Sequence, residues 1–408
     1  MAIYPLKVWI VIIGMLIFGT SSTLTGKGMS QFDIVPCAGC PPIKFSHPYV
    51  QTLFMFIGEF LCLGLYFLID FINKKKGVAD TKLKEGKVFY KFWPHVFLFL
   101  VPTACDTAAS TLYNVGLYFS IASVYQILRN VRVIFVALLS LCIWRDFRVK
   151  FDLPQVFGLV VLFLGATLVA LSAIVFGTAD STAVSPILGV VLTILGCLFS
   201  ALFYCSEELF LRKIQTTGLM GVGNEGGWGI IIYAILLPIF NTVTDPFSSK
   251  NPKEVFDNLS HWVYQMGQSV PEIIIHIAYS FSAMGFNYSG MEVTNNVSAA
   301  ARSTFDACRV ILVWVVSLIV GWETWENKKQ FLQIAGFVLV TFGVLTYNNI
   351  VRVIPFLRES NKIIWGRPCS KLPKVEPIEA EMQPATENNE INVFRSSTVP
   401  LVDEEAKD

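Results

Sequence analysis

The sequence predicts an all-α polytopic membrane protein with ten transmembrane helices, arranged as two inverted five-helix repeats. Of its 408 residues, 54% are hydrophobic and only 15% are charged, whereas soluble proteins carry about 25% charged residues. The apolar residues form stretches of about 20 residues, the length that a helix needs to cross the hydrocarbon core of a bilayer. An internal repeat, given below, relates the two halves. Together these observations disfavour a water-soluble fold.

Hydropathy predicts the helices in order along the chain. The first half holds five, near residues 8–26, 49–72, 94–117, 121–144 and 154–176. The second half holds the other five, near residues 186–206, 226–243, 271–291, 298–321 and 330–350. A cleavable signal peptide is the alternative for the first stretch, but its apolar run is long and Lys7 is the only charge before it.

We therefore expect three parts in the chain. Residues 1–177 form the first five-helix repeat, residues 178–352 form the second, and residues 353–408 form a cytosolic tail. The tail begins with basic residues and ends in an acidic, proline-containing stretch. This composition predicts disorder, because such a segment cannot bury enough apolar surface to fold.

Lysine and arginine are concentrated in alternate loops, which predicts the orientation. The segment between the second and third helices, residues 73–93, is rich in lysine, and the segment after the fourth helix contains Arg145, Arg148 and Lys150. Loops with this excess stay in the cytosol, so both termini are also expected there. Asn258 begins a glycosylation sequon, Asn-Leu-Ser, in a loop that this topology places in the lumen of an organelle.

The two halves resemble each other at an offset of about 177 residues. The matches include Arg132-Val133-Ile134 with Arg309-Val310-Ile311, and then Gly158 and Gly165 with Gly336 and Gly343. A duplicated unit with an odd number of helices enters the membrane in opposite orientations. This is the inverted-repeat plan of secondary transporters, whose solute site lies near the midplane between the halves.

Ionisable residues inside the predicted helices are the main candidates for this site. A charged side chain at the centre of a membrane helix costs roughly 2.5 to 3.5 kcal/mol, so such residues usually face a bundle interior or a wet cavity. The candidate substrate-binding residues are Gln126, Arg129 and Arg132 of the fourth helix, Arg302, Asp306 and Arg309 of the ninth, Asp106 and Asn114 of the third, Glu59 of the second and Asn287 of the eighth.

We interpret these residues as a cationic pocket for an anionic or zwitterionic solute. Arginine presents a planar set of donors that suits phosphate or carboxylate groups, and an acidic residue could supply counter-charge or carry a proton. Structural ion pairs, for example Arg302 with Asp306 within one helix, are the alternative. That alternative is weaker for Arg132 and Arg309, because the sequence shows more mid-membrane arginines than obvious acidic partners.

Three further glutamates are assigned elsewhere. Glu207 and Glu208 end the sixth predicted helix and are interpreted mainly as interfacial residues, and Glu225 stands where the seventh begins. A carboxylate at a helix start is favourable because the N-terminal end of a helix dipole is positive.

The sequence disfavours several other functions. The four histidines form no metal-binding spacing, and no phosphate-binding loop or protease signature is present, so we expect no metal, no cofactor and no enzyme activity. The net charge of +1 gives no reason to expect a nucleic-acid partner. Cys37 and Cys40 form a single CxxC, for which a disulfide or free thiols are favoured over zinc.

Several motifs, together with the ten-helix plan, resemble the drug/metabolite transporter superfamily, in particular solute carrier family 35 and the sixth-member branch of its F group. The resemblance extends over roughly residues 5 to 352. The motifs are His47-Pro48, Gly58-Glu59-Phe60, Cys105-Asp106, Leu128-Arg129, Asn224-Glu225-Gly226, Phe286-Asn287 and the stretch from Ser298 through Arg302, Asp306 and Arg309 to Glu323.

By that resemblance, the repeats would surround a central cavity, with the fifth and tenth helices peripheral and open to homodimer formation. Relatives exchange nucleotide sugars or move other metabolites in Golgi, lysosomal or related membranes. Two features depart from the family pattern. The ninth helix lacks the lysine-containing motif of nucleotide-sugar carriers, and Arg132 is additional to the branch pattern.

The sequence thus predicts a secondary transporter of a small polar, anionic metabolite in an endomembrane, the lysosome or Golgi, with a nucleotide sugar as the first candidate. Two alternatives stay open: a proton-coupled exporter of amino acids or organic ions, and a membrane scaffold or regulator that transports nothing. The expected partners are a small-molecule solute and the lipid bilayer.

Overall fold

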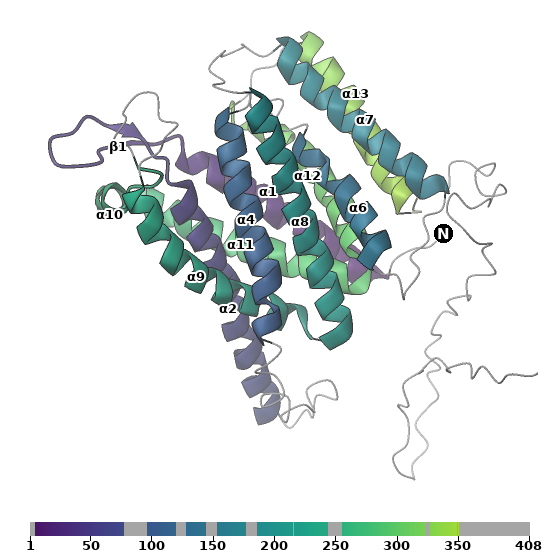
Figure 1. The fold of residues 1–408 in the computed structure, drawn as a ribbon, viewed down its shortest axis with the longest axis horizontal. Coiled ribbons are helices and arrows are strands. Elements are labelled where there is room, and N and C mark those ends of the chain that lie inside the picture. Colours follow the sequence, from purple (N-terminus) through teal and green to yellow (C-terminus); the bar gives the residue numbers. More distant parts are fainter. Residues whose placement is uncertain are drawn as a thin grey trace, which may run out of the picture. The chain divides into compact units, whose positions relative to one another are not determined.

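The computed structural model describes residues 5–76, 96–119, 128–143, 153–176, 186–214, 216–243, 255–322, 327–348 and 350. These residues belong to one compact unit, Met1–Gly366, while the second unit, Arg367–Asp408, lies outside the described residues, and so does the prediction of a disordered tail. The described part is almost entirely helical (Figure 1).

Each of the ten predicted ranges contains a helix. The first five are α1 (Leu6–Met29), α2 (Pro48–Lys75), α4 (Leu100–Phe119), α6 (Arg132–Ile143) and α7 (Leu153–Phe176). The second five are α8 (Pro186–Ile214), α9 (Gly218–Thr242), α11 (Val270–Asn296), α12 (Ala299–Ile319) and α13 (Asn327–Tyr347). Three short elements lie outside these ranges: the paired strands β1 (Asp33–Ile34) and β2 (Ile43–Lys44), and helix α10 (Leu259–Gln268).

Five of the described helices are long and apolar enough to cross a membrane, namely α1, α2, Val96–Gly116, Ile187–Leu211 and α9. The apolar parts of α7 and α13 are shorter in the described residues, Leu153–Val169 and Phe331–Tyr347. Helices α11 and α12 contain charged residues at several positions, which lowers their hydropathy. The chain is therefore an all-α, multi-pass membrane protein.

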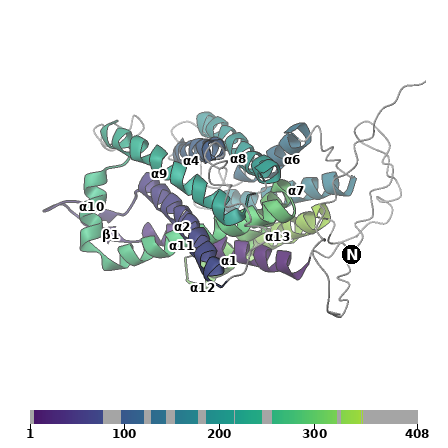
Figure 2. The same ribbon diagram turned by 90° about the horizontal axis from the view of Figure 1, so that it is seen from below.

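The helices pack in a recurring set of pairs. The most extensive contacts join α7 to α13, α4 to α8, α1 to α11 and α2 to α9, and smaller ones join α6 to α12, α6 to α8 and α1 to α12. Figures 1 and 2 show α7 and α13 side by side in both views. One core cluster connects α1, α6, α7, α12 and α13 through side chains such as Ile12, Leu162 and Phe305.

Glycines allow the backbones of α7 and α13 to touch. A Cβ atom at Gly158 would stand 2.8 Å from the carbonyl oxygen of Gly343, and one at Gly165 would stand 2.8 Å from that of Gly336. The reverse contacts are equally close, at 2.7 Å and 2.8 Å. Small residues serve this purpose in membrane helices, because close packing replaces the hydrophobic driving force that lipid does not supply.

Candidate functional site

Charged side chains from six helical segments meet inside the bundle and divide into two groups. We call the first the cationic group: Arg129, Arg132, Asp306 and Arg309. We call the second the acidic group: Glu59, Asp106, Glu207 and Glu225, with Arg302. Every candidate charged residue from the sequence belongs to one of these groups, and each group joins both halves of the chain.

In the cationic group, two arginines share one carboxylate. Nη2 of Arg132 donates to Oδ2 of Asp306 over 2.7 Å, and Nε of Arg309 lies 3.2 Å from Oδ1 of the same residue. Arg132 begins α6, whereas Asp306 and Arg309 lie one turn apart on α12. The polar faces of the fourth and ninth predicted helices therefore meet, as the repeat led us to expect.

The arginines of this group keep accessible surface although they lie within the bundle. The side chain of Arg132 is 12% exposed and that of Arg309 is 18% exposed, whereas Asp306 is buried. Arg129, just before α6, is exposed, stacks on the ring of Tyr113 and also interacts with Asp306. Asp306 thus interacts with three guanidinium groups, and all three side chains keep some accessible surface.

In the acidic group, Arg302 of α12 pairs with Glu207 of α8. Nη1 of Arg302 donates to Oε2 of Glu207 over 2.5 Å, and each side chain is only 1% exposed. The guanidinium also stacks on Tyr204, 4.5 Å from the ring centroid. Its Nε and Nη2 atoms form no hydrogen bond to the described residues. The pair predicted as an alternative, Arg302 with Asp306, is wrong: Arg302 pairs with Glu207 of α8, and Asp306 pairs with Arg132 and Arg309.

The remaining carboxyls of the acidic group approach this ion pair from three helices. Oε1 of Glu59 on α2 accepts a hydrogen bond of 2.5 Å from the amide of Asn287 on α11. Glu225 of α9 interacts with Glu207 and with Arg302. Asp106 of α4 interacts with Arg302 and also with Arg132 and Arg129 of the cationic group. The acidic group therefore contains four carboxyls and one guanidinium.

The structure corrects the assignment of the three glutamates. Glu207 is buried in an ion pair and is not an interfacial residue. Glu208 is also buried, and its Oε2 accepts a bond of 3.1 Å from the backbone N–H of Ala299 at the start of α12. Glu225 does not begin a helix, because α9 starts two turns earlier, at Gly218.

These corrections remove the argument that mid-membrane arginines outnumber the acids. Five carboxyls and four arginines make up the two groups in the described residues. For Glu225, the sequence contained a usable signal: the motif Asn224-Glu225-Gly226, on which part of the family resemblance rests. For Glu207, nothing in the sequence alone indicates that it is the partner of Arg302.

Two other candidates are not brought into either group. Asn114 lies on α4, about two turns beyond Asp106, and is half-buried, but the contacts of the two groups among the described residues do not include it. Gln126 lies outside the described residues. Asn258, the predicted glycosylation site, caps α10: its Oδ1 accepts a bond of 3.1 Å from the backbone N–H of His261.

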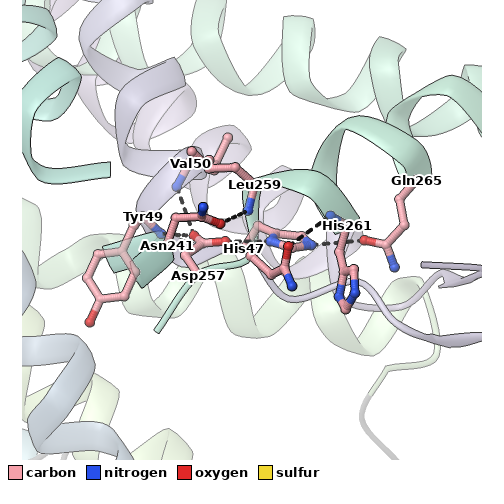
Figure 3. A network of polar contacts seen from close by, with 9 residues as sticks. His47, Tyr49, Val50, Asn241, Asp257, Leu259, His261 and Gln265 are labelled. Atoms are coloured by element: carbon pink, nitrogen blue, oxygen red, sulfur yellow. Dashed lines mark hydrogen bonds and ion pairs between the residues drawn. The ribbon is translucent and has the colours of Figure 1, made fainter. Parts of the chain in front are cut away.

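A second polar network, missed by the sequence analysis, fixes the start of α2 (Figure 3). Nδ1 of His47 lies 2.5 Å from Oδ1 of Asp257, and Nε2 lies 2.9 Å from Oε1 of Gln265. The second oxygen of Asp257 accepts from the backbone N–H groups of Tyr49 and Val50, at the first turn of α2. We call His47, Asp257 and Gln265 the His47 network. All three side chains are buried, and the network connects the start of α2 to α10.

The loop beside this network contains a disulfide. Cys37 and Cys40 are bonded to each other between β1 and β2, which decides between the two alternatives favoured from the sequence. Among the described residues, no group of three His, Cys, Asp or Glu side chains is arranged to hold a metal ion.

Comparison with known proteins decides the family. No family model matches the sequence. Human solute carrier family 35 member F6 is 30% identical to it over 360 residues, which cover 88% of this chain and 91% of the human protein. The chain belongs to solute carrier family 35. The resemblance seen in the motifs is thereby confirmed, and because family members are membrane transporters and not enzymes, the same holds for this chain.

Other relatives agree with this membership. The rat protein of the same name is 30% identical over 83% of this chain, and an uncharacterized protein of Schizosaccharomyces pombe is 29% identical over 83%. A crystal structure of another protein has the same fold, with a TM-score of 0.54 over 85% of this chain and 99% of its own, at 10% identity. Membership in solute carrier family 35 therefore places the two charged groups in a transporter.

Proposed function

We propose that the chain is a secondary transporter that moves a small, anionic metabolite across an endomembrane by alternating access, with a nucleotide sugar as the first candidate. One observation carries the proposal. Arg132 and Arg309, from opposite halves of the chain, share a single carboxylate, Asp306, and keep 12% and 18% of their side chains accessible inside a membrane bundle.

The packing of the helices supports an inverted repeat of residues 1–177 and 178–352. In this repeat, the helices α1, α2, α4, α6 and α7 of the first half correspond, in that order, to α8, α9, α11, α12 and α13 of the second. When each helix is replaced by its counterpart, the contact between α1 and α11 becomes the contact between α8 and α4. In the same way, the contact between α1 and α12 becomes the contact between α8 and α6. The pairs α2–α9, α6–α12 and α7–α13 become themselves. All of these pairs are in contact. Such an exchange of repeat conformations is the basis of alternating access.

The glycine contacts follow the same rule. The repeat relates Gly158 to Gly336 and Gly165 to Gly343. The observed contact of Gly158 with Gly343 therefore becomes, on exchange, the contact of Gly336 with Gly165, which is also observed. A pseudo-twofold axis between α7 and α13 accounts for both contacts, and it supports ten spans in two inverted copies.

The charge arrangement favours an anionic solute. Charged groups in an apolar interior must be paired, because their burial is otherwise very unfavourable. Asp306 supplies this pairing for two arginines. An entering phosphate or carboxylate would offer each guanidinium a second acceptor, in the bidentate geometry that arginine prefers. Asp306 then acts as the counter-charge that keeps the empty carrier stable enough to return.

Two independent features support the orientation. The lysine-rich segment follows the C-terminal end of α2, where positive charge marks the cytosolic side. The Cys37–Cys40 disulfide precedes the opposite end of α2, and disulfides persist in oxidising compartments. Both features support an orientation with the His47 network and Asn258 in the lumen and the termini in the cytosol, as we propose for a lysosomal or Golgi carrier.

Counterflow into liposomes tests the proposal. Purified protein is reconstituted with internal UMP, and uptake of radiolabelled UDP-N-acetylglucosamine, UDP-glucose and GDP-mannose is measured. We expect uptake of at least one probe, reduced at least tenfold in Arg309→Ala and Arg132→Ala. Lys74→Ala, which changes an exposed residue paired with Asp70 at the end of α2, is the control and should leave uptake unchanged. Wild-type uptake in both arginine variants, with folding intact, would refute the assigned site.

A further inference from the structure

Gln265 determines which atom faces the first ring nitrogen of His47. The side-chain nitrogen of Gln265 donates a hydrogen bond of 3.2 Å to the backbone carbonyl oxygen of Ile34, at the end of β1. A carbonyl oxygen only accepts hydrogen bonds, so the amide nitrogen must face Ile34 and the amide oxygen must face His47. Nε2 of His47 lies 2.9 Å from that oxygen and therefore carries a hydrogen.

The second ring nitrogen of His47 also faces an acceptor. Nδ1 lies 2.5 Å from Oδ1 of Asp257, and Oδ2 of the same carboxyl accepts from the backbone N–H groups of Tyr49 and Val50 (Figure 3). Nitrogen and oxygen at such a distance share a hydrogen, because two lone pairs would repel each other. The two backbone donors and the positive end of the α2 dipole favour the carboxylate form of Asp257. The hydrogen therefore belongs to His47, which is an imidazolium.

From these contacts we infer that His47 and Asp257 form a proton-binding site, occupied as an imidazolium–carboxylate pair, that holds the two halves of the chain together beside the start of α2. The two side chains are 7% and 0% exposed. Without the proton, Nδ1 would face a buried carboxylate with no hydrogen bond, which is unfavourable. A proton is favoured over a metal ion, because the described residues contain no group of three ligands arranged for one.

Two further titratable groups near His47 belong to α11. Phe45 packs edge-on against the rings of both His47 and His276, and His276 and Glu272 interact electrostatically with His47. Nδ1 of His276 lies 2.9 Å from the backbone carbonyl oxygen of Glu272 and 3.5 Å from its Oε1, so this nitrogen carries a hydrogen. Its Nε2 is buried without a hydrogen-bond partner in the described residues. His276 is therefore a neutral histidine with its hydrogen on Nδ1.

The His47 network joins elements from both proposed repeats. The strand β1 and the start of α2 belong to residues 1–177, whereas Asp257 and Gln265 belong to residues 178–352. Loss of the proton as the pH rises removes the hydrogen bond between His47 and Asp257, so the contact is strong in acid and weak at higher pH. Alternating access moves one repeat against the other. If this step is included, the inference rests on the proposed function, and the proton comes from the lumen.

Nuclear magnetic resonance of the histidine ring nitrogens tests the proton site without any substrate. The full chain has four histidines, and the imidazolium and the two neutral forms of a labelled ring give distinct nitrogen signals. At about pH 5, where histidines begin to titrate, we expect His47 to be an imidazolium and His276 to be neutral with its hydrogen on Nδ1. A correlation with an aspartate carboxyl carbon assigns His47 in the wild type itself. A neutral His47 would overturn the inference.

Asp257→Asn is the matched variant, because an amide can keep the hydrogen bonds without the extra proton. Its nitrogen would donate to Nδ1 of a neutral His47, and its oxygen would still accept from the start of α2. We expect the imidazolium signal of His47 to be replaced by that of the neutral form with the hydrogen on Nε2. Glu272→Gln, which changes the other nearby carboxyl, is the control and should keep the imidazolium. An imidazolium that is retained in Asp257→Asn, or lost in Glu272→Gln, would overturn the inference.

Thermal unfolding at several pH values tests whether the proton strengthens the contact. The native wild type holds a proton that native Asp257→Asn lacks, so the wild type should lose stability relative to this variant as the pH rises. We expect the difference in unfolding temperature, wild type minus Asp257→Asn, to fall steadily between about pH 5 and pH 8. A difference that stays constant over this range would contradict the inference.

Counterflow over the same pH range then tests the role of the contact in transport. With the probe that exchanges in the wild type, the rate should rise with pH, because the contact between the halves weakens, and it should rise less in Asp257→Asn. An equal pH dependence in the two proteins would show that the contact does not control transport. The spectroscopic and unfolding measurements need no solute, so they separate the failure of this inference from the failure of the proposed function.

Discussion

Arg302 and Glu207 form an ion pair of 2.5 Å between α12 and α8, and each side chain is only 1% exposed. Removing one member of a buried pair is strongly destabilising, by roughly 3–5 kcal/mol, because an unpaired charge stays buried. Here the two sides of the pair are not equivalent. Glu225 also interacts with Arg302 and can take the place of Glu207, whereas Arg302 is the cation that pairs with Glu207 in the described residues.

This asymmetry gives the first prediction. Arg302→Met should lower the thermal unfolding temperature of the purified protein clearly more than Glu207→Gln, because Arg302→Met leaves Glu207 unpaired while Glu207→Gln lets Arg302 pair with Glu225. The measurement is the unfolding temperature in one detergent, with Glu208→Gln as the reference. Equal losses in the two variants would show that Glu225 does not reach Arg302.

The contact between α7 and α13 gives the second prediction. Gly158→Leu and Gly343→Leu should each destabilise the protein by about 1–3 kcal/mol or more, because overpacking a tight contact forces the backbones apart. Gly64 of α2 is the matched control, since nothing lies within 4 Å of a Cβ at that position. Gly64→Ala should be neutral or stabilising by up to about 1 kcal/mol, because alanine favours helix over glycine.

The shared carboxylate gives the third prediction. In Asp306→Asn, the arginines Arg132 and Arg309 lose their common counter-charge, so the site without solute becomes less stable. An anionic solute then no longer competes with the Asp306 carboxylate for the two guanidinium groups. The half-saturation concentration for the exchanged nucleotide sugar should fall severalfold. Net efflux, in which the empty carrier must return, should slow more than exchange does. An equal effect on efflux and exchange would argue against a role for Asp306 in the empty carrier.

The sequence predicted the helices well, because apolar length is a property of each segment by itself. All ten predicted ranges contain a helix, and α11 and α12 were found although their charged residues lower their hydropathy. The strands β1 and β2 and helix α10 were not predicted, since they are short and their pairing depends on the rest of the fold.

The site was predicted only in part, for a physical reason. Asp306 and Arg309 are conspicuous because a charge inside an apolar stretch is unfavourable without partners. Glu207 was missed because the apolar stretch ends beside it, and a window of hydropathy cannot distinguish a buried carboxyl at this position from an interfacial one. Its partner Arg302 is 95 residues away, so only the folded chain reveals the pair.

The His47 network gives the last prediction. His47 joins Asp257 and Gln265, which are more than 200 residues away in the sequence, and all three side chains are buried. His47→Ala removes the ring nitrogens that contact Asp257 and Gln265, so these two buried polar side chains lose a hydrogen-bond partner. Such a loss costs roughly 1–3 kcal/mol for a neutral group and more for a charged one.

The thermal unfolding temperature of His47→Ala should therefore fall by several degrees. Asp257 also holds the first backbone N–H groups of α2, so Asp257→Ala should lower it at least as much. His261→Ala is the matched control, because His261 contributes only its backbone N–H to the Asn258 cap and the substitution leaves that group in place. An unfolding temperature that is unchanged in His47→Ala would show that the contact with α10 does not stabilise the start of α2.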